Sequence, residues 1–113
     1  MRTVEWGRLR ASELRRAAER DAIVVLPIGA TEQHGPHLPV MVDHRLVFEV
    51  ALRAARRVVE REPIVVAPVV PYGMSEHHVS LGGTLTLDYA TMKGVMACLC
   101  DSAIRQGFRR ICI

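Results

Sequence analysis

The sequence predicts an α/β protein, a three-layer α/β/α arrangement with a mostly parallel sheet, from the order of its apolar segments. Short apolar runs at residues 22–28, 64–67 and 110–113 have the composition of buried strands. Two longer segments with helical periodicity, residues 43–61 and 88–106, separate these runs. A strand–helix–strand–helix–strand order folds as a parallel sheet with right-handed crossovers. Because an average sheet has about five to six strands, we expect the fold to be truncated after the third strand.

The first part of the chain divides into a helix, a strand and a loop. Ser12 is predicted to cap a short helix that Asp21 ends. Residues 22–28, AIVVLPI, form a nearly continuous apolar run, which is the pattern of a strand covered on both faces. Residues 29–42 contain Gly35 and two prolines and cannot form a regular element, yet they are dense in polar side chains.

The rest of the chain repeats this alternation. The predicted helix at residues 43–61 has an apolar stripe formed by Val47, Val50, Ala51, Ala54 and Val58. A long loop at residues 68–83 follows the second strand, and Thr86 or Asp88 is predicted to cap the next helix. Gly107 ends that helix. Its apolar stripe comprises Met92, Val95, Met96, Leu99, Ala103 and Ile104.

Composition and charge exclude several classes of function. A chain of 113 residues with 50% hydrophobic and 24% charged residues is typical of one folded domain. No apolar run approaches the roughly 18 residues of a membrane helix, and residues 1–20 lack the apolar centre of a signal peptide, so we expect a cytoplasmic protein without a membrane partner. The net charge of +3 comes from arginines interleaved with glutamates, and aromatic residues are scarce. This pattern predicts a solvated face and no nucleic-acid partner.

Polar side chains gather directly after the first predicted strand. In open α/β sheets, reacting groups lie just beyond the carboxyl ends of the strands. Glu32 and His34 are two residues apart in this position, so in an extended chain their side chains project to the same side. Asp43 stands at the predicted start of the next helix, where the helix dipole favours a carboxylate. Two carboxylates and an imidazole, without a thiolate, suit Zn²⁺, Mn²⁺ or Fe²⁺.

Each of these residues also has an ordinary structural explanation. Taken singly, Glu32 would be an exposed loop carboxylate, His34 a hydrogen-bonded loop histidine, and Asp43 a helix N-cap. Residue spacing by itself leaves both interpretations open. Of the neighbouring histidines, His37 is expected to order the loop through hydrogen bonds, and His44 is expected to lie on the surface.

Three blocks of the sequence resemble the creatininase family. Residues 27–44, PIGATEQHGPHLPVMVDH, are similar to a family pattern in which a strand runs into G-(S/A)-x-E-Q-H-G-P-H-L-P and then an aspartate. Residues 71–87, PYGMSEHHVSLGGTLTL, are similar to Y-G-x-S-x-x-H-x-x-F-P-G-T-x-x-L. Residues 107–113, GFRRICI, are similar to the strand that precedes N-G-H-G-G-N in the family. The resemblance identifies residues 1–113 as the N-terminal part of a single creatininase-like domain.

The resemblance implies a metal-dependent amidohydrolase, which hydrolyses a C–N bond of an amide or cyclic amide through a metal-bound hydroxide. By position, Glu32 and His34 are each similar to a ligand of one of two metal ions, and Asp43 is similar to the carboxylate that bridges both. The implied cofactors are two divalent ions per complete site, Zn²⁺ or Mn²⁺, with Fe²⁺ as a further possibility. The implied partners are a small-molecule amide substrate and, in the complete protein, further copies of the chain in a homo-oligomer.

The second block both follows and departs from the family pattern. His78 falls on the histidine of the pattern and is predicted to contact the substrate or support the ligands, with an ordinary polar loop residue as the alternative. His77 beside it is additional. Leu81 and Gly82 replace the Phe-Pro of the pattern, which loosens the loop before Gly83.

Two functions remain open at this point. The first is the amidohydrolase reaction, which belongs to the complete protein. The second is a truncated, catalytically inactive fragment of the family that at most binds metal or self-associates through an unfinished sheet edge. The sequence does not define which amide is the substrate, because most of the residues that line the pocket belong to the absent half.

Overall fold

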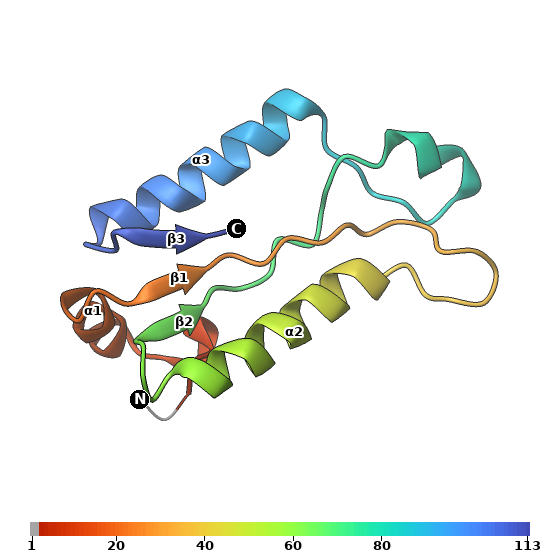
Figure 1. The fold of residues 1–113 in the computed structure, drawn as a ribbon. Helices are drawn as coiled ribbons and strands as arrows, with labels where there is room; N and C mark the ends of the chain where they lie inside the picture. The colour runs from red at the N-terminus through yellow and green to blue at the C-terminus, as the bar shows by residue number, and fades with distance from the viewer. Residues whose placement is uncertain (1–2) are drawn as a thin grey trace.

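The computed structural model describes residues 3–113, so the first two residues of the predicted domain, Met1 and Arg2, lie outside the described part. A three-stranded parallel sheet is flanked by helices, which confirms the predicted α/β class (Figure 1). The strands are β1 (Ile23–Val25), β2 (Ile64–Val66) and β3 (Arg110–Cys112). The α-helices are α1 (Ala11–Glu19), α2 (Val42–Val58) and α3 (Tyr89–Arg105), and two 3-10 helices are η1 (Trp6–Arg8) and η2 (Glu76–Leu81).

The strand β1 is central, because the strands lie in the order β2-β1-β3. Ile23 pairs with Ile64 of β2 and with Arg110 of β3, and both pairings are parallel. The hydrogen-bonded part of β1 is shorter than the predicted strand at residues 22–28, since Pro27 has no N–H with which to continue the ladder. The strand β3 lies at the sheet edge and is partly exposed, so the prediction of a buried third strand was wrong.

The core is divided into two clusters, one on each face of the sheet. Side chains alternate between faces along a strand, so Val65 and its neighbour Val66 belong to different clusters. The first cluster joins the sheet to α1 and α3 and comprises Leu14, Ala17, Ala18, Ala22, Val24, Val65, Ala103 and Phe108. The second joins it to α2 and comprises Val4, Leu52, Ala55, Ile64 and Val66. This is the predicted three-layer arrangement.

The buried face of α2 differs from the predicted stripe. Val50 is 64% exposed, and Ala54 is exposed as well, although both were expected to face the sheet. Leu52 and Ala55 are buried instead, with Phe48 packed beside them. A valine-rich helix supports two overlapping apolar stripes, and the larger side chains of Phe48 and Leu52 determine which stripe the sheet covers.

The helix α3 contacts the sheet through its C-terminal end only. Ala103 is its one buried residue, whereas Leu99 and Ile104 of the predicted stripe are 40% and 58% exposed. Figure 1 shows the N-terminal part of the helix leaning away from the strands. An apolar cavity of about 350 Å³ lies between the C-terminal half of the helix and the sheet, with Leu26, Ala67 and Leu99 among its lining. The stripe therefore exists in the sequence but is mostly uncovered in this chain.

The helix termini correct one prediction and confirm another. Ser12 is not the cap of α1, because the helix begins at Ala11 and its N-cap is Arg10. The backbone N–H of Arg10 donates to the Glu13 carboxylate at 2.9 Å. Asp88 is the N-cap of α3, since its carboxylate accepts a 2.7 Å hydrogen bond from the backbone N–H three residues later. Within residues 3–113, no helix has the length and apolar character needed to cross a membrane.

Candidate metal centre

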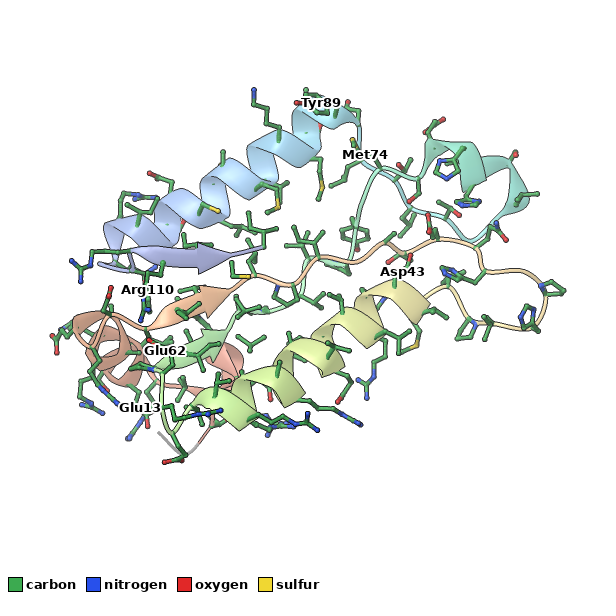
Figure 2. The ribbon with its side chains drawn as sticks, in the orientation of Figure 1. Glu13, Asp43, Glu62, Met74, Tyr89 and Arg110 are labelled. Atoms are coloured by element: carbon green, nitrogen blue, oxygen red, sulfur yellow. The ribbon has the colours of Figure 1, made fainter. Side chains whose placement is uncertain are left out.

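The site begins with a close approach between two backbone segments. A Cβ atom added to Gly29 would lie 2.5 Å from the Cα and the backbone N of His44, so only glycine lets the first turn of α2 lie against the chain that leaves β1. His44, which was expected on the surface, is half-buried by this packing. Asp43, labelled in Figure 2, lies at the N-terminal end of α2 beside that chain.

Hydrogen bonds from a second loop keep the segment after Gly29 extended. Thr31 forms an isolated antiparallel bridge with Leu85, whose N–H donates to the Thr31 carbonyl oxygen at 3.0 Å. The Thr31 hydroxyl donates to the carbonyl oxygen of Pro71 at 2.5 Å. The backbone N–H of Gln33 donates to the hydroxyl of Thr84 at 3.0 Å. Residues 71–88 thus act as the strap that holds the polar segment beyond the carboxyl end of β1.

The three predicted ligand residues converge in the structure. Glu32, His34 and Asp43 each offer a nitrogen or oxygen atom, and these atoms lie within 4.8 Å of one another. His34 Nε2 is 3.1 Å from Asp43 Oδ1. All three side chains are partly buried, with Glu32 the least exposed at 18%. A single divalent ion bound about 2.0–2.2 Å from each atom would fit such a group.

The tautomer of His34 is fixed by the backbone. His34 Nδ1 lies 3.0 Å from the carbonyl oxygen of Glu32, so Nδ1–H donates there and leaves the Nε2 lone pair facing Asp43. This hydrogen bond is also the largest cause that raises the pKa of His34, opposed by burial and aided by the charges of Asp43 and Glu32. A metal-binding histidine commonly has this arrangement, in which one ring nitrogen donates to a carbonyl and the other binds the ion.

The Glu32 carboxylate is kept ionised by its neighbours. The hydroxyl of Ser75 is the largest cause that lowers the pKa of Glu32, and it outweighs the desolvation that acts in the opposite direction. Asp43, His78 and His34 lower it further. Ser75 is only 1% exposed and comes from the strap. The sequence analysis did not single out this serine, although it stands at the serine position of the Y-G-x-S block.

His78 reaches the same edge of the sheet from η2, a short helix inside the predicted loop at residues 68–83. Its Nε2 is 3.8 Å from Glu32 Oε2, and its Nδ1 is 2.8 Å from the amide nitrogen of Gln33. The ring of His77 packs against it with the two centroids 4.1 Å apart. Glu32, His77 and His78 form a second group of possible ligand atoms within 4.8 Å of one another.

The glycine that replaces proline in the second block gives this loop a backbone shape that proline cannot adopt. Gly82 has a φ of 84°, in the left-handed region, whereas the proline ring fixes φ near −65°. Gly83 follows with a φ of 69°. The departure from the Phe-Pro pattern therefore changes the path of the backbone between His78 and Thr84, both of which contact the polar segment.

The fold and the cluster together define an α/β protein with a group of carboxylates and an imidazole suited to a divalent ion beyond its central strand. A profile of the family described as Creatininase, creatinine amidohydrolase, matches residues 7–113. The chain belongs to the creatininase family.

Curated relatives agree with this assignment. A creatinine amidohydrolase of Pseudomonas putida is 37% identical over 101 residues, which cover 85% of this chain and 37% of the relative. A mycofactocin precursor peptide peptidase of Mycobacterium tuberculosis is 37% identical over 70 residues, which cover 57% of this chain and 28% of the relative. The chain thus spans about a third of the length of these relatives.

Solved structures show the same relation. A crystal structure of creatinine amidohydrolase superposes with a TM-score of 0.88 and 33% identity, covering 98% of this chain and 44% of that one. A manganese form of creatininase gives a TM-score of 0.87 with 34% identity, covering 96% and 43%. A zinc–zinc form of a creatininase variant gives 0.86 with 34% identity and the same coverage. The same creatininase variant was also solved in complex with creatine, with a TM-score of 0.88 and 32% identity.

Proposed function

We propose that the complete protein is a metal-dependent amidohydrolase that cleaves a C–N bond of an amide or cyclic amide, with Glu32, His34 and Asp43 as metal ligands. The single observation that carries this proposal is the convergence of the three side chains, with the Nε2 lone pair of His34 aimed at the cluster. His34 Nε2 lies 3.1 Å from Asp43 Oδ1, so the two side chains form an ion pair when His34 is protonated, and a divalent ion would take the place of that proton between them.

The donor set fits Zn²⁺ or Mn²⁺, and each residue has a defined task. A bound divalent ion supplies Lewis acidity, which activates water and polarises an amide carbonyl. Asp43 and His34 present an oxygen and a nitrogen on one side, while Ser75 keeps the carboxylate of Glu32 ionised on the other. His78 stands beside Glu32 and is proposed to contact the substrate. Manganese and zinc forms among the similar structures support the choice of metal and a two-ion complete site.

The proposed partners follow the same reasoning. Creatine in one similar structure supports a small-molecule amide as substrate, and creatinine is the first compound to test. We further propose a cytoplasmic protein whose complete form is a homo-oligomer. The arginines and glutamates of α2 pair with each other on its exposed side, as Arg45 and Arg53 do with Glu49, which supports a solvated face and no nucleic-acid partner.

A second candidate function is a metal-binding chain without catalytic activity. The two possible ligand groups share Glu32, so residues 3–113 supply a full set of ligands for one ion at a time. The chain also spans less than half of the solved family structures. The edge strand β3 and Ile113, which is 71% exposed, would give such a chain a surface for self-association.

The first test measures binding of Zn²⁺ and Mn²⁺ to the 113-residue chain by titration calorimetry. Replacing Glu32→Gln or Asp43→Asn should weaken binding by at least about 100-fold, the upper end of what even outer partners of a metal site cost. Asp101→Asn is the matched control, because Asp101 is an exposed carboxylate paired with Arg105. Equal binding by the control and the two ligand variants would remove the metal centre from the proposal.

The same proteins separate the two candidate functions when they are assayed for hydrolysis of creatinine, simple amides and short peptides. We expect the 113-residue chain to show no turnover above metal-free controls, since misplacing a reacting group by 1 Å can already cost about 100-fold in rate. Turnover that disappears in Glu32→Gln would contradict this expectation and would show that the chain is an enzyme without further residues.

A further inference from the structure

The two histidines of the site, His34 and His78, are held in opposite tautomers by their hydrogen-bond partners. His34 Nδ1 faces a carbonyl oxygen, which only accepts, so His34 must carry its proton on Nδ1. His78 Nδ1 faces the amide NH₂ group of Gln33 at 2.8 Å, which only donates, so this nitrogen must be the acceptor. The proton of the uncharged His78 ring is therefore on Nε2, the atom that points towards Glu32.

The orientation of the Gln33 amide is itself fixed by the backbone. Its oxygen, Oε1, accepts a 2.9 Å hydrogen bond from the N–H of Gly35. Turning the amide over would bring its NH₂ group against that N–H. The hydrogen bond from Gly35 N–H would be lost whichever tautomer His78 has, at a cost of about 1 kcal/mol, and two N–H donors would face each other there. Gly35 has a φ of 74°, so this tight turn suits glycine.

We propose that Gln33 sets His78 as a hydrogen-bond donor through Nε2–H, which receives an acceptor oxygen of the substrate, such as an amide carbonyl or a carboxylate, beside the metal centre. The distance of 3.8 Å between His78 Nε2 and Glu32 Oε2 is longer than an N–H···O bond, so Glu32 attracts the donor without occupying it. The inference rests on the proposed function for the identity of the acceptor, whereas the assignment of the tautomer stands on the hydrogen bonds alone.

This tautomer of His78 also determines which of the two possible ligand groups can bind a metal ion. A nitrogen that carries a proton cannot bind a metal ion, so the group of Glu32, His77 and His78 is not a second metal site while Gln33 holds His78. Glu32 is then left to the ion that His34 and Asp43 bind. Gln33 is thus a positioning residue, which acts on the substrate only through His78.

The test observes both ring nitrogens of each histidine in the full 113-residue chain by long-range ¹H–¹⁵N NMR. We expect the proton of His78 on Nε2 and the proton of His34 on Nδ1. Adding Zn²⁺ should shift Nε2 of His34 and leave His78 protonated at Nε2. A His78 proton found on Nδ1 in the unaltered chain overturns the proposal. Zn²⁺ that leaves His34 unaffected argues against the metal centre instead, and the tautomer of His78 is read independently of it.

Variants of Gln33 test its role. In Gln33→Glu, a carboxylate can accept from both Gly35 N–H and His78 Nδ1–H, so the proton of His78 should appear on Nδ1. Gln33→Met keeps the length of the side chain without hydrogen bonds, and it should give a mixture of the two His78 tautomers. An unchanged His78 pattern in both variants would show that Gln33 does not set the tautomer.

Binding of a substrate oxygen by His78 is tested by adding creatine, a ligand that carries a carboxylate, to the chain in solution. We expect the Nε2–H signal of His78 to shift with creatine, and His78→Asn to retain part of the affinity because its amide also donates. His78→Phe should lose that part while the fold, followed by circular dichroism, stays intact. Equal affinity in the Asn and Phe variants would mean that no donor is used at this position.

Discussion

The scaffold around the three strands and the polar edge beyond their carboxyl ends are stabilised by different means. The first contains the strand ladder, both core clusters and the ion pairs of Arg110 with Asp21 and Glu62. The second consists of residues 29–43 and 71–88, and within residues 3–113 the buried apolar side chains all lie outside these two ranges. Hydrogen bonds of Thr31 and Thr84 hold the edge together in place of apolar packing.

This difference separates stability from chemistry. Burial of apolar surface supplies most of the folding free energy, so the scaffold should determine whether the chain folds. The edge holds half-exposed polar groups whose value lies in their orientation, as with His34 and His78. Changes in the scaffold should therefore lower the free energy of unfolding and leave the metal affinity unchanged. Changes at the edge should mainly lower the metal affinity. Phe108→Ala and Gly29→Ala test this contrast, and Asp88→Ala tests a helix cap at the border of the two regions.

Phe108→Ala should have the largest effect on stability. Phe108 is 1% exposed and packs against Trp6 with ring centroids 5.3 Å apart. Truncating a buried phenylalanine costs about 3–5 kcal/mol, which is a large share of the roughly 5–15 kcal/mol that stabilises a domain. Urea denaturation followed by the fluorescence of Trp6, the one tryptophan, measures this loss. Zn²⁺ affinity of the folded fraction should not change, and a parallel loss of affinity would mean that scaffold and edge are coupled.

Gly29→Ala should affect the site more than the scaffold. Its Cβ would lie 2.5 Å from backbone atoms of His44, so the start of α2 must move away and carry Asp43 with it. We expect a loss of about 1–3 kcal/mol in stability and a fall of about 10- to 100-fold in Zn²⁺ affinity.

The matched control for this change is Gly94→Ala, at a position in the middle of α3 where an added Cβ meets no atom within 4 Å. It should raise stability by about 1 kcal/mol through helix propensity and leave metal affinity unchanged. If both alanine variants bind Zn²⁺ like the unaltered chain, the close approach at Gly29 is not what places Asp43.

Asp88→Ala should have the smallest effect, since it removes one exposed helix cap. The backbone N–H of Thr91 lowers the pKa of Asp88, so the stabilisation is fully present above the unfolded pKa of about 3.9 and is lost as pH falls through the lowered value. Thermal unfolding at neutral pH should show a decrease of a few degrees in Tm. The difference in Tm between the variant and the unaltered chain should become smaller as pH falls through the lowered pKa of Asp88. A difference in Tm that stays constant with pH would exclude the charged cap as its cause.

The fold was predictable where nearby residues determine the local structure, and less so where packing against other elements determines which side chains are buried. The apolar runs at β1 and β2 and the breaking residues Gly35 and Gly107 determine local structure directly, so the parallel sheet and the helix positions followed from the sequence. The buried face of α2 did not follow from the sequence, because packing against the sheet determines which of two overlapping apolar stripes is covered. The uncovered stripe of α3 shows a third case, in which the sequence carries an apolar face that residues 3–113 do not cover.

The candidate site shows the same division. The spacing of Glu32 and His34 and the place of Asp43 left a metal site and ordinary loop residues both open, and the resemblance to the creatininase family favoured the convergence that the structure has. Ser75 and Gln33 were not predicted, since a serine and a glutamine acquire meaning only from what they contact, here Glu32 and His78. Hydrogen-bond partners that lie 45 residues apart leave no local signal in a single sequence.

The central place of β1 imposes an order of assembly during synthesis. Its two neighbours come from later parts of the chain, with the β3 partner of Val25 about 87 residues further on at Cys112. At about 5–20 residues per second, β3 leaves the ribosome roughly 4 to 17 s after β1. During that interval an apolar strand has no partner on one side, and pairing over such a sequence distance is slow to begin. Placing the earliest strand in the middle of the sheet therefore leaves nascent β1 exposed to association with other chains until β3 has been made.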